Sequence, residues 1–146
     1  MSGLWTWVSG NNVISQSGSY GIQGTAAASN VPGGRDNAIS WSDSGHNLWL
    51  FGGYGVDSTR SLSDLNDLWK FDTVSGLWTW VSGSSLPNQS GSYGTPGVTA
   101  PANVPGARQR SISWIDNSNT LWLFGGSGRD SAGAAGYLND LWRYQP

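Results

Sequence analysis

Hydrophobic residues occur along the chain in short runs, which alternate with longer polar stretches rich in Gly and Ser. In the first half of the chain these runs are residues 4–8, 38–41, 48–51 and 68–71. Their length and their content of Trp, Phe, Leu, Ile and Val predict β-strands. Two short polar stretches, 43–47 and 73–76, are rich in the residues that favour tight turns. We therefore predict antiparallel strands that follow one another without helices.

Hydrophobic residues occupy both faces of the strand predicted at 48–51. Side chains alternate between the two faces of a strand, and the run Leu48-Trp49-Leu50-Phe51 leaves neither face polar. Both faces of this sheet are therefore expected to be buried, unlike those of a half-solvated sheet. A small sheet covered on both sides is typical of a β-propeller blade, which lies between two others. The predicted fold class is all-β, built from propeller blades.

The chain consists of two copies of one 73-residue pattern. The segment at 3–10 recurs at 76–83, and the segments at 30–33, 48–53 and 65–69 recur at the same offset. Of the 73 aligned positions 40 are identical, and no insertion or deletion separates the copies. We therefore divide one domain, 1–146, into repeat 1 (1–73) and repeat 2 (74–146), each of which supplies the strands of one blade.

Several motifs at these fixed offsets resemble the kelch family of β-propellers. The run of four hydrophobic residues ends in a double glycine, Gly52-Gly53, as in the kelch signature. Pro32 and Arg35 resemble the lead-in to the innermost kelch strand, and Trp69 lies where kelch repeats usually have Tyr. Trp78 matches the Trp of the fourth kelch strand, and the other copy has Arg108, Gly125, Gly126, Trp142 and Trp5 at these positions.

The resemblance implies four-stranded antiparallel blades, two in this chain. Repeat 2 would lack a fourth strand of its own, and residues 4–8, from the same chain or from another copy, are expected to supply it. Two blades cannot close a ring, because propellers have about four to eight. We therefore expect the chain to assemble with itself head to tail, as a six-bladed trimer or, next in preference, an eight-bladed tetramer.

Composition excludes several classes of function. The chain has no Cys, no Glu and one His, His46, so neither a disulfide framework nor a cysteine zinc site is expected. A net charge of −2 gives no footprint for nucleic acid, and no apolar run is long enough for a membrane span. General acid–base and nucleophilic catalysis lack the residues they need. We expect a protein that is not an enzyme and has no cofactor and no metal.

Candidate binding residues lie where the innermost strand begins. Arg35 and Arg108 are expected near a central channel, where they either bind an anion or, as the resemblance favours, bond turn carbonyls. Asp36 lies beside them, and Asn37 and Arg110 occupy a position where kelch repeats favour Gly or a small residue. A repeat of 73 residues also exceeds the roughly 50 of kelch repeats.

Two long loops, 9–34 and 54–64, are expected on one face, where binding sites are commonly built. We expect a binding scaffold whose glycan or protein ligand the sequence does not identify. The alternative is a carbohydrate-binding or cell-surface adhesion module, for which Tyr20 and Tyr93 are loop aromatics to test. Asp57 and Asp130 are weak candidates for calcium. No signal peptide is recognised, although low Lys and abundant Trp would suit an extracellular parent protein.

Overall fold

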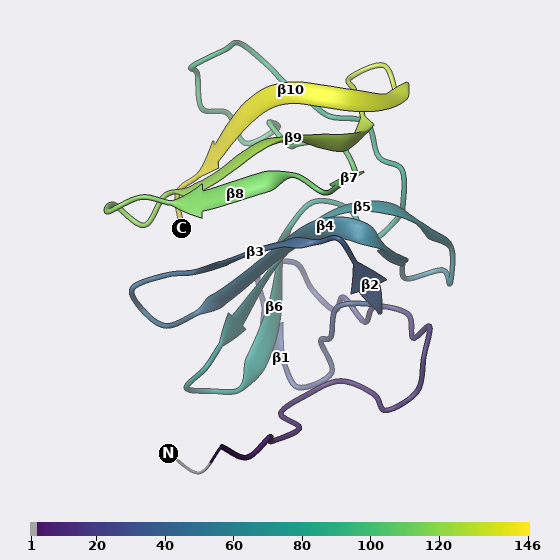
Figure 1. Cartoon of the computed structure of the whole chain (residues 1–146), viewed down its shortest axis with the longest axis vertical. Coiled ribbons are helices and arrows are strands. Elements are labelled where there is room, and N and C mark those ends of the chain that lie inside the picture. Colours follow the sequence, from purple (N-terminus) through teal and green to yellow (C-terminus); the bar gives the residue numbers. More distant parts are fainter. Residues whose placement is uncertain (1–2) are drawn as a thin grey trace.

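The chain forms two antiparallel β-sheets that pack against each other (Figure 1). We describe a computed structural model, which covers residues 3–146. No helix occurs in this range, and so none that could cross a membrane. The all-β class predicted from the sequence is confirmed.

The first sheet has the strand order β1-β6-β5-β4-β2, and β3 also pairs with β4. Tight turns join β3 to β4 and β5 to β6, as predicted, and cross-strand pairs such as Trp41 with Trp49 and Trp69 with Trp80 fix the register. The strands are β1 (Ala26–Ala27), β2 (Arg35–Asp36), β3 (Ile39–Ser42), β4 (Leu48–Val56), β5 (Leu62–Asp72) and β6 (Leu77–Ser82).

The second sheet repeats the same arrangement but stops earlier. Its order is β10-β9-β7, with β8 also paired to β9, and its strands begin 73 residues after their counterparts. They are β7 (Arg108–Gln109), β8 (Ile112–Ile115), β9 (Leu121–Arg129) and β10 (Ala135–Tyr144). Within residues 3–146 no strand pairs with the outer edge of β10, whereas the equivalent edge of β5 is covered by β6.

The core lies between the two sheets. Trp49 and Phe51 of the first sheet pack in one buried cluster with Leu121 and Leu123 of the second. The repeat-2 counterparts of Trp49 and Phe51 are Trp122 and Phe124, which point to the other face of their sheet than Leu121 and Leu123. The two sheets therefore meet through opposite faces. Leu48 is therefore 46% exposed and Phe124 38% exposed on the two free faces. The expectation that both faces are buried holds for neither sheet in a single chain, because each has only one neighbour.

Two further expectations need correction. Residues 4–8 form no strand, since no sheet edge lies beside them to accept their hydrogen bonds. The loop expected at 54–64 is much shorter: β4 runs to Val56 and β5 begins at Leu62, because the glycines after Phe51 bend β4 without ending it. A register shift between Phe51 and Gly53 accommodates that bend. The stretch 9–34 is long, as predicted, and contains only β1 as a named strand.

Candidate functional site: an unfilled strand position

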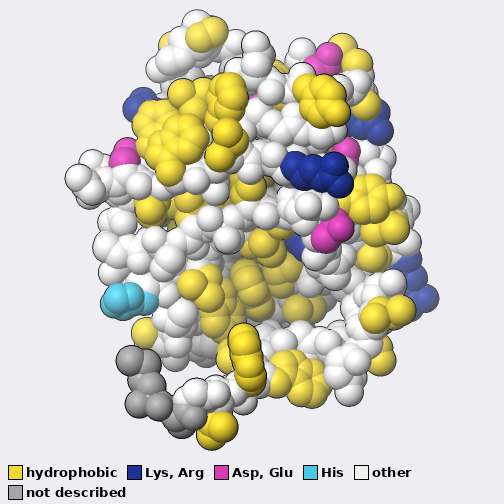
Figure 2. Space-filling view, in the orientation of Figure 1, with side chains coloured by type: hydrophobic (Ala, Val, Ile, Leu, Met, Phe, Trp, Pro, Cys, Tyr) yellow, Lys and Arg dark blue, Asp and Glu magenta, His cyan; other side chains and the backbone are white. Residues whose placement is uncertain are grey.

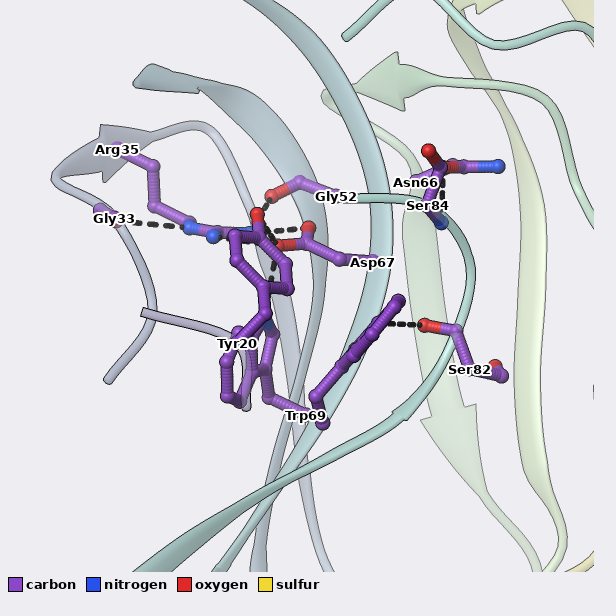
Figure 3. A network of polar contacts seen from close by, with 10 residues as sticks. Tyr20, Gly33, Arg35, Gly52, Asn66, Asp67, Trp69, Ser82 and Ser84 are labelled. Atoms are coloured by element: carbon purple, nitrogen blue, oxygen red, sulfur yellow. Dashed lines mark hydrogen bonds and ion pairs between the residues drawn. The ribbon is translucent and has the colours of Figure 1, made fainter. Parts of the chain in front are cut away.

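A buried ion pair anchors the long loop of repeat 1 to its sheet. The guanidinium of Arg35 donates to both carboxylate oxygens of Asp67, at 2.6 and 2.8 Å, and to the carbonyls of Gly33 and Gly52. Tyr20 and Trp69 donate to the same carboxylate, each at 2.7 Å (Figure 3). The loop, the inner strand and the third strand of the meander thus meet at one carboxylate.

Solvent has little access to this network, and each of its side chains is hydrogen-bonded within it. The side chains of Arg35 and Asp67 are 5% and 0% exposed. Burial and the neighbouring Asp67 carboxylate raise the pKa of the Tyr20 hydroxyl far above its usual range, so it stays a donor. A buried pair of this kind is costly to break, because either partner alone would be an uncompensated charge. Arg35 is therefore a structural residue in the chain described here.

Repeat 2 has the same network in a more exposed form. Arg108 donates to the Asp140 carboxylate at 2.6 and 2.8 Å, and Tyr93 and Trp142 each donate to it at 2.7 Å. The side chain of Asp140 is nevertheless 15% exposed. Burial raises its pKa, but the hydrogen bonds from Arg108, Trp142 and Tyr93 outweigh that effect and lower the pKa to about 2.

Strand β6 accounts for the difference between the two networks. In the first sheet Trp80 packs edge-on against Tyr20, with ring centroids 5.2 Å apart, and Trp78 packs against Trp69 and Phe71 at 6.3 and 5.0 Å. In the described part of the second sheet, Trp142 has an aromatic neighbour only in Tyr93. The strand that seals the first network has no counterpart on the second.

The empty position forms a groove of about 1130 Å³ beside β10. Its lining includes β10 and the segment 95–105, which corresponds to the part of repeat 1 that pairs with the far side of β6. The groove also reaches the contact between the sheets, where Trp41, Phe51 and Leu68 line it. There Gly24 N–H donates to the Trp80 carbonyl at 2.8 Å, and Asn30 donates to the Trp78 carbonyl at 3.1 Å. Gly97 and Asn103 are the counterparts that line the groove. The groove therefore has the donors for one more strand.

Residues 4–9 have the sequence of β6 and project away from the sheets. Trp5 is fully exposed and Trp7 is 67% exposed, whereas Trp78 and Trp80 are half-buried. Figure 2 shows hydrophobic side chains along this segment at the lower edge of the molecule and in a patch over the sheet β7–β10. Trp7 donates its indole N–H to the Ser9 carbonyl at 2.9 Å, as Trp80 does to Ser82. Residues 4–9 thus already make one of the hydrogen bonds that their counterparts make within β6.

Glycines lie where β4 and β9 bend, and Gly52 also lies close to the other sheet. Gly52 has a φ of +61°, and a side chain there would approach the Arg108 carbonyl of the other sheet at 2.7 Å. Gly53 has a φ of +96°, and a side chain there would approach the Asp36 carbonyl at 2.6 Å. Gly125 and Gly126 repeat both conformations in the second sheet. The double glycine is therefore required by backbone shape and by close packing.

The other sequence-predicted binding residues lie together at the inner strands and are exposed. Asp36, Asn37 and Arg110 have exposed side chains, and the Arg110 N–H donates to the Asn37 carbonyl at 3.0 Å across the two sheets. Asn37 and Arg110 have φ values of +51° and +59°, which explains why a small residue is favoured there. The structure brings these three residues together.

The remaining candidates have structural partners. Asp57 and Asp130 accept backbone N–H groups of their own turns, and among residues 3–146 no cluster of three His, Cys or Asp side chains could hold a metal ion. Tyr20 is 6% exposed. Sequence reasoning missed that Tyr20 and Tyr93 donate to Asp67 and Asp140. Their offset of 47 residues is the same in both repeats, which was the available signal.

Comparison with known proteins gives little guidance on identity. No family model matches the chain, and neither does any curated protein sequence. A solved structure titled "Structure of YjhT" is similar over 72% of this chain, with 24% identity and a TM-score of 0.49. The matched region is 25% of that chain, so this sequence spans about a quarter of its length.

Proposed function

We propose that the chain is a non-catalytic, kelch-like propeller fragment that closes a ring by head-to-tail assembly with copies of itself. The observation that carries the proposal is the unfilled strand position beside β10, together with exposed residues 4–9 that repeat the sequence of β6. In a ring, residues 4–9 of one copy become the fourth strand of the second sheet of its neighbour. Each sheet is then one blade.

The chain's own first sheet supplies the register of this contact. Trp80 pairs with Trp69, Thr79 with Lys70 and Trp78 with Phe71. We replace each residue of β6 by its counterpart in repeat 1 of the neighbour, and each residue of β5 by its counterpart in β10. Trp7 of the neighbour then lies opposite Trp142, Thr6 opposite Arg143 and Trp5 opposite Tyr144. The same replacement directs Gly97 N–H to the Trp7 carbonyl and Asn103 to the Trp5 carbonyl.

The two free faces of the chain also complement each other. Within the chain, Trp41 of the first sheet donates its indole N–H to the Trp114 and Trp122 carbonyls at 3.0 and 3.1 Å. Its counterpart Trp114 is 45% exposed, beside Ile112 at 63%. Apolar patches of this kind mark interaction surfaces. Docked on the free face of the next copy's first sheet, around Leu48, Trp114 would be covered as Trp41 is.

Head-to-tail contacts close when the rotation per chain divides a full turn. Three copies give six blades and four give eight, and both numbers lie within the range that propellers use. We favour the trimer, with the tetramer second. Closure removes every free face and every unpaired outer edge at once, which an open chain of copies cannot do.

Substitution of Gly10 tests whether residues 4–9 of one copy join the second sheet of another. A side chain on Gly83 would collide with the Asn66 carbonyl, whereas nothing lies within 4 Å of Gly10 in the isolated chain. In the ring, Gly10 would lie against Asn139 of the neighbour. Gly10→Ala should therefore leave the monomer folded and raise the dissociation constant of the ring at least about 10-fold, as expected for a backbone clash of about 1–3 kcal/mol. Sedimentation velocity over a dilution series measures this.

Gly24→Ala is the matched control. Gly24 has a φ of +80°, close to the +89° of Gly10, and nothing lies within 4 Å of it although β6 is already in place beside it. Both variants carry the same cost of a side chain at positive φ. Equal ring dissociation constants for the two variants would contradict strand exchange at this site.

A further inference from the structure

Beside the hydrophobic core, a polar cluster at Asp64 also joins the two sheets of one chain. Its carboxylate accepts a hydrogen bond from Gln109 at 3.0 Å, and its carbonyl accepts from the Asn88 N–H at 2.8 Å. Burial raises the pKa of Asp64, against the hydrogen bond from Gln109 and the charge of Arg129, which lower it. Arg129 donates to the side-chain oxygen of Asn88 at 3.2 Å. This joint between sheets is therefore made by charged and amide side chains.

The corresponding joint between copies has different chemistry. One repeat after Asp64 comes Tyr137, which is 95% exposed on β10. One repeat before Gln109 and Arg129 come Asp36 and Val56. An aromatic side chain thus replaces the acid on one partner, and an apolar residue replaces the arginine on the other.

An apolar groove lies where Tyr137 of a neighbour would arrive. It has a volume of about 590 Å³ and is lined by Val13, Ile14, Tyr54, Val56 and Leu62, with Asp36 at its wall. Ile14 is 89% exposed and Leu62 is 57% exposed. Repeat 2 has Leu86 and Pro87 in place of Val13 and Ile14. At the positions of Tyr54, Val56 and Leu62 it has Ser127, Arg129 and Ala135, so these three large apolar side chains are specific to repeat 1.

We propose that Tyr137 of one copy inserts into this groove of the next copy and is an anchor of the contact between copies. This inference rests on the proposed ring, because it takes the in-chain joint as the template for the joint between chains. Placed as Asp64 is, the Tyr137 ring packs on Val56 and Leu62, and its hydroxyl donates to Asp36. Tyr is a frequent anchor in protein interfaces, since its ring buries apolar area and its hydroxyl stays bonded.

The difference between the joints has a consequence for assembly. In the chain, Gln109 and Arg129 accommodate an acid, whereas the groove of repeat 1 accommodates an aromatic ring. A second sheet therefore presents to the next copy a residue that suits only a first sheet. Tyr137 does not fit the polar site that Gln109 and Arg129 form, which disfavours a contact between two second sheets. Specific interfaces commonly make the wrong pairing unfavourable in this way.

Two variants and their combination test the anchor. Tyr137→Ala truncates an exposed side chain, and Leu62→Ala introduces the residue that repeat 2 has at the same position. Neither should unfold the chain. Each should raise the dissociation constant of the ring about 10-fold or more, and the double variant should cost less than both effects together, because the two side chains share one contact. Val74→Ala, at a 93% exposed turn residue, is the control and should change the constant less than 2-fold.

The outcomes separate this inference from the proposed function. A ring whose dissociation constant is unchanged in Tyr137→Ala, or in which the two changes are additive, would overturn the anchor while the ring stands. A wild-type chain that forms no ring would overturn the proposed function itself, whatever the variants do.

Discussion

At the scale of single residues, each repeat is organised around one carboxylate. Asp67 and Asp140 each accept hydrogen bonds from an arginine, a tryptophan and a tyrosine, which come from three separate parts of the repeat. These bonds tie the long loop to the sheet, because the tyrosine lies in the loop and the tryptophan in a strand. The two carboxylates differ in exposure since only the first is covered by a fourth strand.

The lowered pKa of Asp140 predicts a loss of stability in acid. Its folded pKa of about 2 lies below the ordinary 3.8, so the ionised group stabilises the fold above about pH 4. This contribution is lost as the pH falls through about 2. The free energy of unfolding from denaturant titrations, at fixed protein concentration, should therefore decline between pH 4 and pH 2.

Asp140→Asn identifies the source of this decline. The pKa values of Asp43 and Asp116 are also lowered, so part of the decline will persist in the variant. The variant should be less stable at neutral pH and should change less between pH 4 and pH 2 than the parent. A pH dependence of equal size in both proteins would show that Asp140 does not contribute.

At the scale of elements, the same six-residue sequence exists in two states within one chain. Residues 77–82 form β6, hydrogen-bonded on both sides, whereas residues 4–9 have the same sequence and form no strand. Local propensity is equal for the two segments, so the difference comes from the neighbours that each one has. A strand forms where a sheet edge accepts its hydrogen bonds.

Hydrogen exchange measures whether residues 4–9 find such edges in solution. At concentrations where the ring forms, the amides of residues 4–9 should exchange as slowly as those of β6. Dilution below the dissociation constant should make residues 4–9, the outer-edge amides of β10 and the 95–105 segment exchange quickly, whereas the amides that bond β10 to β9 stay slow. Fast exchange of residues 4–9 at all concentrations would contradict their docking.

The hydrophobic pattern was sufficient to predict the strands of the first repeat that are buried between the sheets. It did not predict the two-residue strands β1 and β2, nor that residues 4–8 form no strand in the single chain. The runs at 38–41, 48–51 and 68–71 lie within β3, β4 and β5 apart from one residue, because burial between sheets enforces the hydrophobic pattern. The run at 4–8 has the same pattern and no strand, since pattern alone does not say which molecule provides the partner. The extension of β4 to Val56 was not predicted, because a double glycine after a hydrophobic run usually marks the end of a strand, whereas Gly52 and Gly53 bend β4 without ending it.

At the scale of the whole molecule, the chain has unequal ends. One face of the first sheet and the opposite face of the second are free, and both carry exposed apolar side chains, among them Leu48 on the first and Trp114 and Phe124 on the second. Unequal faces favour head-to-tail contacts over a two-fold dimer. In the proposed ring every sheet would have two neighbours, as the hydrophobic pattern at 48–51 leads us to expect.

Native mass spectrometry of the chain tests the ring most directly. The monomer mass is 15.5 kDa, so a closed six-bladed trimer has a mass of about 46 kDa and an eight-bladed tetramer about 62 kDa. We predict one discrete species at one of these masses, with the first favoured. A soluble monomer that persists at all concentrations, or a ladder of masses without a limit, would contradict the ring.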